Sequence, residues 1–404
     1  MRSFAMTVIC ALHLAIFAIS DAAAQGSPLY VNAAASGKND GSTWSDALTD
    51  LPTALAVAKA GQQIWVAGGT YYPTRDDDRE RSFQLTDAIS LYGGFAGTEA
   101  DLVERDWQTN PTILSGNITH GDNPRANSKH VVIAANGAVI DGFVIQDGYG
   151  VGDGARGNSH LTPREILQQR DGVGAGLLVF QTDITVRNTV IRNNAAMKGG
   201  GVFNMTNVSG NSFNGGRIPV FINVDFYNNY ALARGGAMSN DLGTNPIIIN
   251  SRFINNRCDI KGGAIYNDFS ASPVILNSSF AANTASSAAA IGNDGTSSPI
   301  IVNTKIAGNI ATDAGAGLFQ GSYNANLIGT ENAPVVIRSE IQDNVSSTHG
   351  VASISNWGED WVYAYDSAIA DWYFSEPELP HKYQKLVEIA DRLRSQTPQA
   401  STAG

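Results

Sequence analysis

The chain repeats itself with a period of about 27 residues. The copies align on five prolines, Pro219, Pro246, Pro273, Pro299 and Pro334. These are 27, 27, 26 and 35 residues apart, and the copies read PVFINVDFYNN, PIIINSRFINN, PVILNSSFAAN, PIIVNTKIAGN and PVVIRSEIQDN. A further copy without the proline, ITVRNTVIRNN, begins at Ile184. Short apolar runs separated by turn residues are typical of strands, and a fixed period of this length predicts a stack of equivalent coils.

Equivalent positions of the copies should lie above one another, because neighbouring parallel strands are about 4.8 Å apart. The apolar residue seven positions after the proline then forms a continuous core. Asn at a turn can adopt the left-handed conformation, and its amide both donates and accepts hydrogen bonds along the stack. We therefore expect the asparagines ten positions after the proline to form a structural ladder: Asn194, Asn229, Asn256, Asn283, Asn309 and Asn344.

The repeat predicts an all-β fold, a parallel β-helix over residues 25–366 with its regular coils at about 184–357. A stack of coils exposes its ends, which need caps against edge pairing. Within an N-terminal cap of about 25–62, Asp50 can N-cap a short helix over 51–60 that stops at Gly61. Residues 367–404 are expected to form an amphipathic helix and a polar tail. We expect the helix to cover the last coil with one apolar stripe, Leu379, Tyr383, Leu386, Ala390 and Leu393.

Composition disfavours several classes of protein. Only 16% of the 404 residues are charged, and the formal net charge is −11. Nucleic acid is therefore not an expected partner, because that affinity rests on Lys and Arg neutralising phosphates. The 42 glycines and the frequent asparagines disfavour a helix bundle, since both residues have poor helix propensity. The 43% of hydrophobic residues can fill a large core, which disfavours disorder.

The first 24 residues have the features of a secretory signal. Arg2 precedes an apolar run, and Ala22, Ala23 and Ala24 supply a small-residue cleavage site. We expect the mature chain to be exported and to have no membrane span, since no second long apolar stretch follows. Cys258 is then the one remaining cysteine. It cannot form an internal disulfide, and it has no patterned His nearby, so we expect a structural thiol.

Two long segments carry a family resemblance. YVNAAASGKNDGSTWSDALTDLPTALAVAKAGQQIWVAGGTYYPT, from Tyr30, and ISLYGGFAGTEADLVERDWQTNPTILSGNI, from Ile89, resemble bacterial secreted right-handed parallel β-helix proteins. The later GGAM and GGAI tetrapeptides, with FYNN, FINN and FAAN, resemble the GGA[ILV] and FxxN repeats of the polymorphic outer membrane proteins. Together these segments cover roughly residues 29–357. The resemblance implies a right-handed, pectate-lyase-like solenoid that is extracellular or associated with the bacterial outer membrane. The repeat departs from the pattern near its end, at AAAIGN and GAGLFQ.

Charged residues gather in three loops rather than in the repeats. Asp76, Asp77 and Asp78 are candidate Ca²⁺ ligands, because hard cations prefer carboxylate oxygens. Their spacing matches no calcium-loop motif, so a solvated loop is favoured. A second loop, at 117–130, carries a weaker metal-type set: His120, Asp122, Arg125 and His130. No other cofactor is indicated.

The insertion at 150–172 carries the candidate catalytic residues, which are Arg156, His160, Arg164 and Asp171. Thr162-Pro163-Arg164-Glu165 forms a capping box, which predicts a short helix to about residue 169. Long insertions over a rigid repeat often carry function. An ornamental surface helix is the plainer alternative.

Two functions remain open. The first is an exported β-helix that binds glycan or cell-envelope components without catalysis. Two observations favour it: outward repeat positions are mostly Ser, Thr and Asn, and the known signatures of β-helix lyases and polygalacturonases are missing. The second is a polysaccharide lyase or glycoside hydrolase acting on an acidic polysaccharide near the 150–172 loop. This alternative rests on the Arg/His/Asp cluster and on fold analogy.

Overall fold

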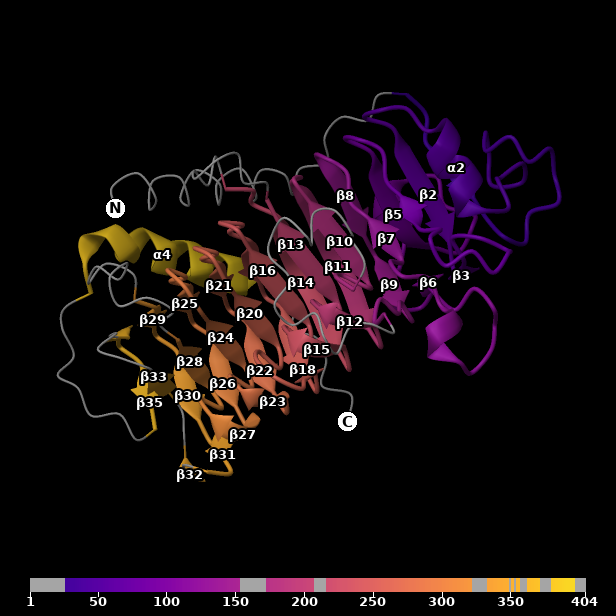
Figure 1. The fold of residues 1–404 in the computed structure, drawn as a ribbon. Coiled ribbons are helices and arrows are strands. Elements are labelled where there is room, and N and C mark those ends of the chain that lie inside the picture. Colours follow the sequence, from indigo (N-terminus) through magenta and orange to yellow (C-terminus); the bar gives the residue numbers. More distant parts are fainter. Residues whose placement is uncertain are drawn as a thin grey trace.

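The chain builds three parallel sheets, A, B and C, whose strands stack along one axis (Figure 1). The computed structural model describes residues 26–152, 172–206, 216–321, 333–348, 350–351, 354–356, 362–370 and 379–396. Among these residues sheet A has 19 strands, sheet B nine and sheet C seven. The pairing is parallel throughout, apart from β31 with β32. This arrangement agrees with the repeat read from the sequence.

The strands of sheet A are β1 (Leu29–Val31), β2 (Gln63–Ala67), β3 (Gly69–Tyr71), β5 (Ser90–Phe95), β6 (Thr112–Ser115), β8 (Ala138–Asp141), β9 (Phe143–Gln146), β11 (Ile184–Arg192), β14 (Val220–Tyr227), β17 (Ile247–Ile249), β18 (Arg252–Ile254), β21 (Val274–Leu276), β22 (Ser279–Ala281), β25 (Ile300–Val302), β26 (Lys305–Ala307), β29 (Val335–Ile337), β30 (Glu340–Gln342), β34 (Tyr363–Tyr365) and β35 (Ala368–Ile369). The strands of sheet B are β4 (Phe83–Gln84), β7 (Val132–Ile133), β10 (Leu177–Phe180), β13 (Val202–Met205), β16 (Met238–Asp241), β20 (Ile265–Asn267), β24 (Ile291–Asn293), β28 (Leu318–Gln320) and β33 (Ile354–Asn356). The strands of sheet C are β12 (Ala195–Lys198), β15 (Tyr230–Arg234), β19 (Arg257–Cys258), β23 (Thr284–Ser287), β27 (Ile310–Ala314), β31 (Val345–Ser346) and β32 (Gly350–Val351).

From β11 to β31 the coils visit the sheets in the same order, whereas the earlier coils pass from sheet A to sheet B without a strand in sheet C. The chain makes two short stretches in sheet A, then one strand in sheet C and one in sheet B, as in β17, β18, β19 and β20. The two stretches in sheet A are called its first and second halves below. A residue with positive φ separates them, for example Asn250 (φ 50°) and Asn277 (φ 51°). In the last full copy Arg338 takes the same conformation (φ 47°), so the turn is kept where Asn is replaced.

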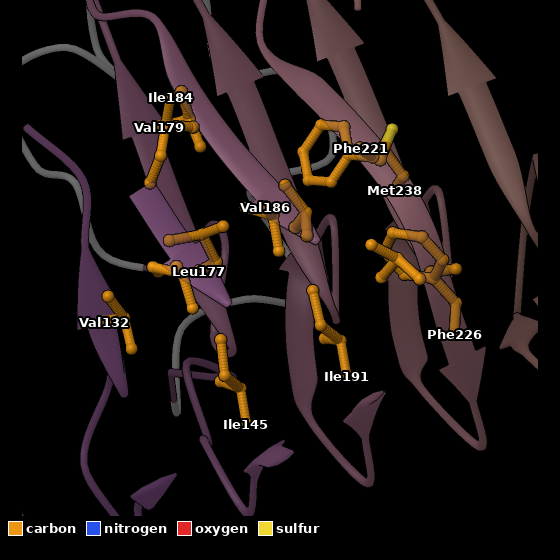
Figure 2. Packing of buried hydrophobic residues seen from close by; sticks show 14 of the residues in the cluster. Val132, Ile145, Leu177, Val179, Ile184, Val186, Ile191, Phe221, Phe226 and Met238 are labelled. Atoms are coloured by element: carbon orange, nitrogen blue, oxygen red, sulfur yellow. The ribbon is translucent and has the colours of Figure 1, made fainter. Parts of the chain in front are cut away.

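The interior is a continuous apolar column. Figure 2 shows its side chains pointing inward from several strands: Val132, Ile145, Leu177, Val179, Ile184, Val186, Ile191, Phe221, Phe226 and Met238. Phe226, Phe253 and Phe280 occupy the seventh position of three successive copies and pair in register. Their rings stack with centroids 4.5 Å apart. In-register stacking thus converts the sequence period into a packed core.

The six asparagines of the tenth position form one hydrogen-bonded column. Each Nδ2 donates to the Oδ1 of the next amide, over 3.1 Å for Asn194 to Asn229 and 2.8 Å for Asn309 to Asn344. The amides are at most 1% exposed. A second column, in sheet B, runs from Asn204 through Asn240 and Asn267 to Asn293.

Near the start, helix α2 (Leu51–Val57) begins where the sequence predicts. Asp50 Oδ1 accepts a hydrogen bond from the backbone N–H of Thr53 (2.9 Å). The helix ends three residues earlier than expected, because the backbone of Ala58 is already extended (ψ 140°). Its buried side chains join the core beside β1 and β4: Leu51, Ala54 and Leu55. Two 3₁₀ turns, η1 (Leu102–Glu104) and η2 (Pro124–Ala126), lie in later loops.

The C-terminal helix α4 (His381–Gln396) does not close the end of the stack as expected. It runs along the outer side of the first half of sheet A, beside β21 and β25 (Figure 1). Those strands are apolar on both faces, so their outer side chains need a cover. Leu386 and Leu393 are buried against them, and Asn277 donates to the carbonyl of Ala390 (2.8 Å). Arg338 pairs with Asp391 (3.1 Å).

Candidate functional site

The predicted catalytic residues Arg156, His160, Arg164 and Asp171 lie outside the described residues. The ends of their loop are described. Gly172 accepts hydrogen bonds from the backbone N–H groups of Met197 (2.8 Å) and Lys198 (3.0 Å), and Gly150 N–H donates to Ala195 O (2.8 Å). Both described ends, Gly150 and Gly172, therefore lie beside β12 in sheet C.

The predicted calcium ligands lie in an exposed loop and are engaged locally. Asp76 Oδ1 accepts from the Thr74 hydroxyl (2.7 Å) and from the backbone N–H of Asp78 (3.0 Å), and these contacts lower the pKa of the Asp76 carboxyl, with the Thr74 hydrogen bond as the largest cause. Asp78 pairs with Arg81 (3.2 Å) and Asp77 is exposed. In the part of the chain that the structure describes, no three His, Cys, Asp or Glu side chains are grouped closely enough to hold a metal ion.

The histidines of the 117–130 loop have separate environments. His120 packs edge-on against Tyr72, with ring centroids 4.4 Å apart. His130 is buried, and its Nδ1 lies 3.1 Å from Gly174 O. Cys258 packs against Ala231 and Ala285. Burial raises the pKa of the Cys258 thiol to about 12, which disfavours a nucleophilic thiolate.

The structure brings together a set of charges that the sequence reasoning missed, here called the charge ladder: Lys198, Arg234, Lys261, Asp241, Asp268 and Asp294. The three basic residues lie at the ends of successive sheet C segments and bridge one another in register. The three aspartates lie at the ends of successive sheet B strands.

Each cation of the charge ladder pairs with the aspartate of the following coil. Lys198 Nζ lies 3.5 Å from Asp241 Oδ2, and Lys261 Nζ lies 2.9 Å from Asp294 Oδ2. Arg234 donates to Asp268 Oδ2.

The charge ladder is buried. Asp241, Asp268 and Asp294 are 1–3% exposed, and the Arg234 and Lys261 side chains are 18% and 22% exposed. Burial, followed by the charge of Asp241, raises the pKa of the Asp268 carboxyl to about 6, against the opposing effect of Arg234.

Two aromatic rings lie among these charges. The guanidinium of Arg234 lies 5.0 Å from the centroid of the Tyr266 ring, and the Tyr266 hydroxyl donates to Asp294. Lys261 Nζ lies 5.3 Å from the centroid of the Phe319 ring. Burial raises the pKa of Tyr266 well above its usual range, so its hydroxyl stays a proton donor.

The tight turn between the two charged columns needs glycine. Gly235 has positive φ (63°), and a Cβ on Gly236 would lie 2.2 Å from the carbonyl oxygen of Gly263 in the next coil. The GGA segments are therefore the turns that join sheet C to sheet B. The repeated six-residue segments that begin at Gly199, Gly235 and Gly262 can be extended by one residue on each side. They then read KGGGVFNM, RGGAMSND and KGGAIYND. That extension contains the sequence signal for the charge ladder.

The outer side of sheet C and of the second half of sheet A is open to solvent. Exposed side chains on it include Tyr227, Arg252, Arg257, Lys305, Ile310, Glu340 and Val345. The first half of sheet A differs, because α4 packs against it.

An arginine–tyrosine patch lies on the open side, and its members are Asp225, Tyr227, Tyr230, Arg252, Arg257 and Asp259. Arg252 Nε donates to Asp225 Oδ1 (2.7 Å). Arg257 donates to Asp259 Oδ1 (2.9 Å).

The tyrosines of the patch lie on either side of one turn. Tyr227 is 42% exposed. The Tyr230 hydroxyl donates to Asp259 Oδ2 (2.7 Å), and the Arg257 guanidinium lies 5.7 Å from the Tyr230 ring centroid. Burial and the Asp259 hydrogen bond raise the pKa of the Tyr230 hydroxyl.

Comparison with known proteins assigns no family. The chain matches no protein-family model, and no curated protein is similar enough to count as a relative. The resemblance to polymorphic outer membrane proteins therefore gains no support beyond the parallel strand stack. Among the described residues, no helix has the length and apolar character needed to cross a membrane.

Proposed function

We propose that the chain is an exported right-handed parallel β-helix of the cell surface or extracellular space, and that it binds a glycan on the arginine–tyrosine patch. The signal-like residues 1–24 support export. The parallel sheets and their repeated order support the β-helix. The repeats resemble those of polymorphic outer membrane proteins, which is consistent with a surface location.

The exposed ring of Tyr227 beside ordered guanidinium–carboxylate pairs is the observation that carries the binding proposal. A sugar combines an apolar ring face with hydroxyl groups that donate and accept. Tyr227 offers an aromatic surface for the ring face. Arg252 and Asp225 offer donors and acceptors held in place by their own ion pair. Such a preorganised surface loses little side-chain entropy on binding.

Binding can be tested with an array of bacterial and plant glycans, followed by titration calorimetry of each retained glycan. We expect Tyr227→Ala to weaken binding at least about tenfold, because the ring supplies the main apolar contact. Ile310→Ala is the matched control: Ile310 is 49% exposed on the same open side but three coils further along. Retention of no glycan by the wild type, or equal affinity of Tyr227→Ala, would contradict the proposal.

A further inference from the structure

The charge ladder is confined to three coils, so the scaffold does not require its charges. The residue that pairs with Asp241 in the preceding coil is Met205, and the one that bridges Lys198 there is Val173. The same backbone thus forms with apolar residues at both positions. Buried ion pairs are at best weakly stabilising compared with apolar residues, so ion pairing alone gives little reason to keep this lysine and this aspartate.

The pair of Lys198 and Asp241 is more deeply buried than the other lysine–carboxylate pairs of the described residues. Both of its side chains are 3% exposed. Each of the other pairs has at least one side chain that is 22% exposed or more. Those pairs are Lys38 with Asp46, Lys129 with Glu80, Lys261 with Asp294, and Lys305 with Glu340. Water therefore has little access to the amine or the carboxylate of the Lys198–Asp241 pair.

The surroundings of Asp241 compensate its charge poorly. Met205, which pairs with Asp241 in register, is 1% exposed and belongs to an apolar cluster with Phe203 and Leu242. Asp241 Oδ2 faces Lys198, whereas Asp241 Oδ1 has no hydrogen-bond partner within the described ranges. A buried carboxylate with one oxygen unpaired is costly, so a reaction that removes both charges of the pair relieves a real penalty.

We propose that Lys198 and Asp241 condense to an isopeptide bond, an amide between their side chains that joins two neighbouring coils covalently. This modification goes beyond the binding function proposed above and does not depend on it. Lys198 Nζ lies 3.5 Å from Asp241 Oδ2, and the carboxyl carbon is bonded to that oxygen, so the amine is within reach of the carbon that it attacks. Reactants held about 3–3.5 Å apart in the right orientation react as if their concentration were about 10⁵–10⁸ M.

The condensation is balanced within the pair itself. The Lys198 ammonium gives one proton to the Asp241 carboxylate, which leaves a neutral amine and a carboxylic acid. The amine nitrogen then attacks the carboxyl carbon, and an N–C bond forms while the C–O bond to the protonated oxygen breaks. That oxygen leaves as water with a second proton from the nitrogen. One ammonium and one carboxylate thus give one amide and one water molecule, and no other reactant is needed.

Two features of the charge ladder favour the amide over the ion pair. The amide has no net charge, so it removes the cost of keeping two ions away from water. Burial, followed by the charge of Asp241, raises the pKa of the Asp268 carboxyl to about 6, so the two carboxylates repel one another. Amide formation removes the charge of Asp241 and with it this repulsion. Exclusion of water also disfavours the reverse reaction, hydrolysis.

The bond would act as a covalent staple of the stack. Cys258 is the one cysteine outside the signal-like residues 1–24, so the exported chain has no internal disulfide. Lys198 ends β12 and Asp241 ends β16 of the following coil, so the two side chains meet only after the coils have stacked. The bond then closes residues 198–241 into a loop, which restricts the unfolded chain and stabilises the folded one.

The test is mass spectrometry of the full chain as purified after export, first intact and then after tryptic digestion. The wild type should be lighter, by the mass of one water molecule, than the mass calculated from its sequence and its observed N-terminus. Trypsin does not cut after a lysine whose amine is an amide, so the digest should contain residues 193–217 joined to residues 235–252. Lys198→Arg keeps the positive charge but has no amine that can condense, so it should have its calculated mass. Lys261→Arg, in the less buried pair with Asp294, is the matched control and should keep the mass deficit.

Three outcomes overturn the isopeptide proposal: a wild type with its calculated mass, a mass deficit that persists in Lys198→Arg, or a linked peptide that joins Lys261 to Asp294 instead. The first and third are read on the wild type, so they do not depend on whether a variant folds. The binding proposal fails separately, because a linked chain that retains no glycan would reject binding on the patch and keep the bond.

Discussion

Arg234 pairs with Asp268 of the following coil, although Asp241 ends the next strand of its own coil. Lys198 and Lys261 also reach forward by one coil, to Asp241 and Asp294. Each pair therefore joins two coils, and neighbouring aspartates come to lie close together. Each cation of the charge ladder attracts the aspartate of the following coil, whereas the stacked aspartates repel one another. These opposing interactions have measurable effects on stability.

Asp268→Asn should change how stability depends on pH. The folded-state pKa of Asp268, about 6, exceeds the unfolded value of about 3.9. Its protonated form therefore favours folding below about pH 4, and that contribution is lost as the pH rises to about 6. Relative to Asp268→Asn, the wild type should lose up to about 3 kcal/mol between pH 4 and pH 7. Urea unfolding at several pH values measures this difference.

The groups that face Asp268 are Arg234, Asp241, Asp294 and Lys198. Arg and Lys keep their charge across this pH range, so the change should come from the carboxyl groups. Asp225→Asn removes a carboxylate on the open side, outside the charge ladder, and serves as the control. A wild type that gains stability relative to Asp268→Asn as the pH rises would show that Arg234 outweighs burial.

The coil period and the Asn column could be read from the sequence because both are local and periodic. Stacking in register turns a repeated Asn256 or Phe253 into a column without further information. The placement of α4 could not be read, because its apolar stripe fits any apolar surface. The outer residues of the first half of sheet A, such as Ile249 and Leu276, are apolar in the five copies that begin with proline and offer that surface, but a strand with two apolar faces does not reveal its cover.

The charge ladder escaped the sequence reasoning for a different reason. Lys198 and Asp241 are 43 residues apart and flank different glycine turns, so their pairing appears only when the one-coil offset is known. The candidate residues of the 150–172 loop lie outside the described residues, and only the end of the loop at Gly172 is placed beside the charge ladder, where its carbonyl accepts from the Lys198 N–H.

Asp141→Ala should destabilise the chain strongly. Asp141 is 1% exposed and accepts from Arg187 and from Asn188 (2.8 Å), and it pairs with Arg105 (2.7 Å). Tyr92 lies 5.2 Å below the Arg105 guanidinium and adds a cation–π contact. Removing the carboxylate takes the anionic partner from two buried guanidinium groups, which costs about 3–5 kcal/mol.

Denaturant unfolding measures the loss for Asp141→Ala. Asp225→Ala removes a carboxylate from the exposed pair with Arg252 and should cost less than about 1 kcal/mol. Equal losses in the two variants would mean that burial of the Asp141 cluster does not matter.

Asn256→Leu should lower stability by about 3 kcal/mol. Asn256 Nδ2 donates to Asn283 Oδ1 and to Phe226 O, both over 3.0 Å, and its Oδ1 accepts from the backbone N–H of Asn229. Leucine leaves these buried partners unsatisfied. The midpoint of thermal unfolding should fall clearly, whereas Ser279→Leu, on the open side, should shift it little. An unchanged midpoint for Asn256→Leu would contradict the ladder.

Cys258 should resist thiol reagents in the native state. Its side chain is 2% exposed, and burial raises its pKa to about 12, so the thiolate is scarce at neutral pH. We expect dithionitrobenzoate to react only as fast as the coil opens, and rapidly in guanidinium chloride. Fast labelling of the native chain would show that β19 opens locally.

Leu386→Asp should release α4 from the stack. Leu386 is 1% exposed against the apolar outer side chains of β17, β21 and β25, so a charge there must leave the interface or be buried unpaired. Release would expose the apolar strip along the first half of sheet A, which should increase binding of the dye ANS and allow trypsin to cut at Arg392 and Arg394. The exposed position next to it provides the control, because Lys385→Asp keeps the apolar stripe intact. If Leu386→Asp resists trypsin as well as Lys385→Asp does, the ion pair of Asp391 with Arg338 and the hydrogen bond from Asn277 hold the helix without the apolar contact.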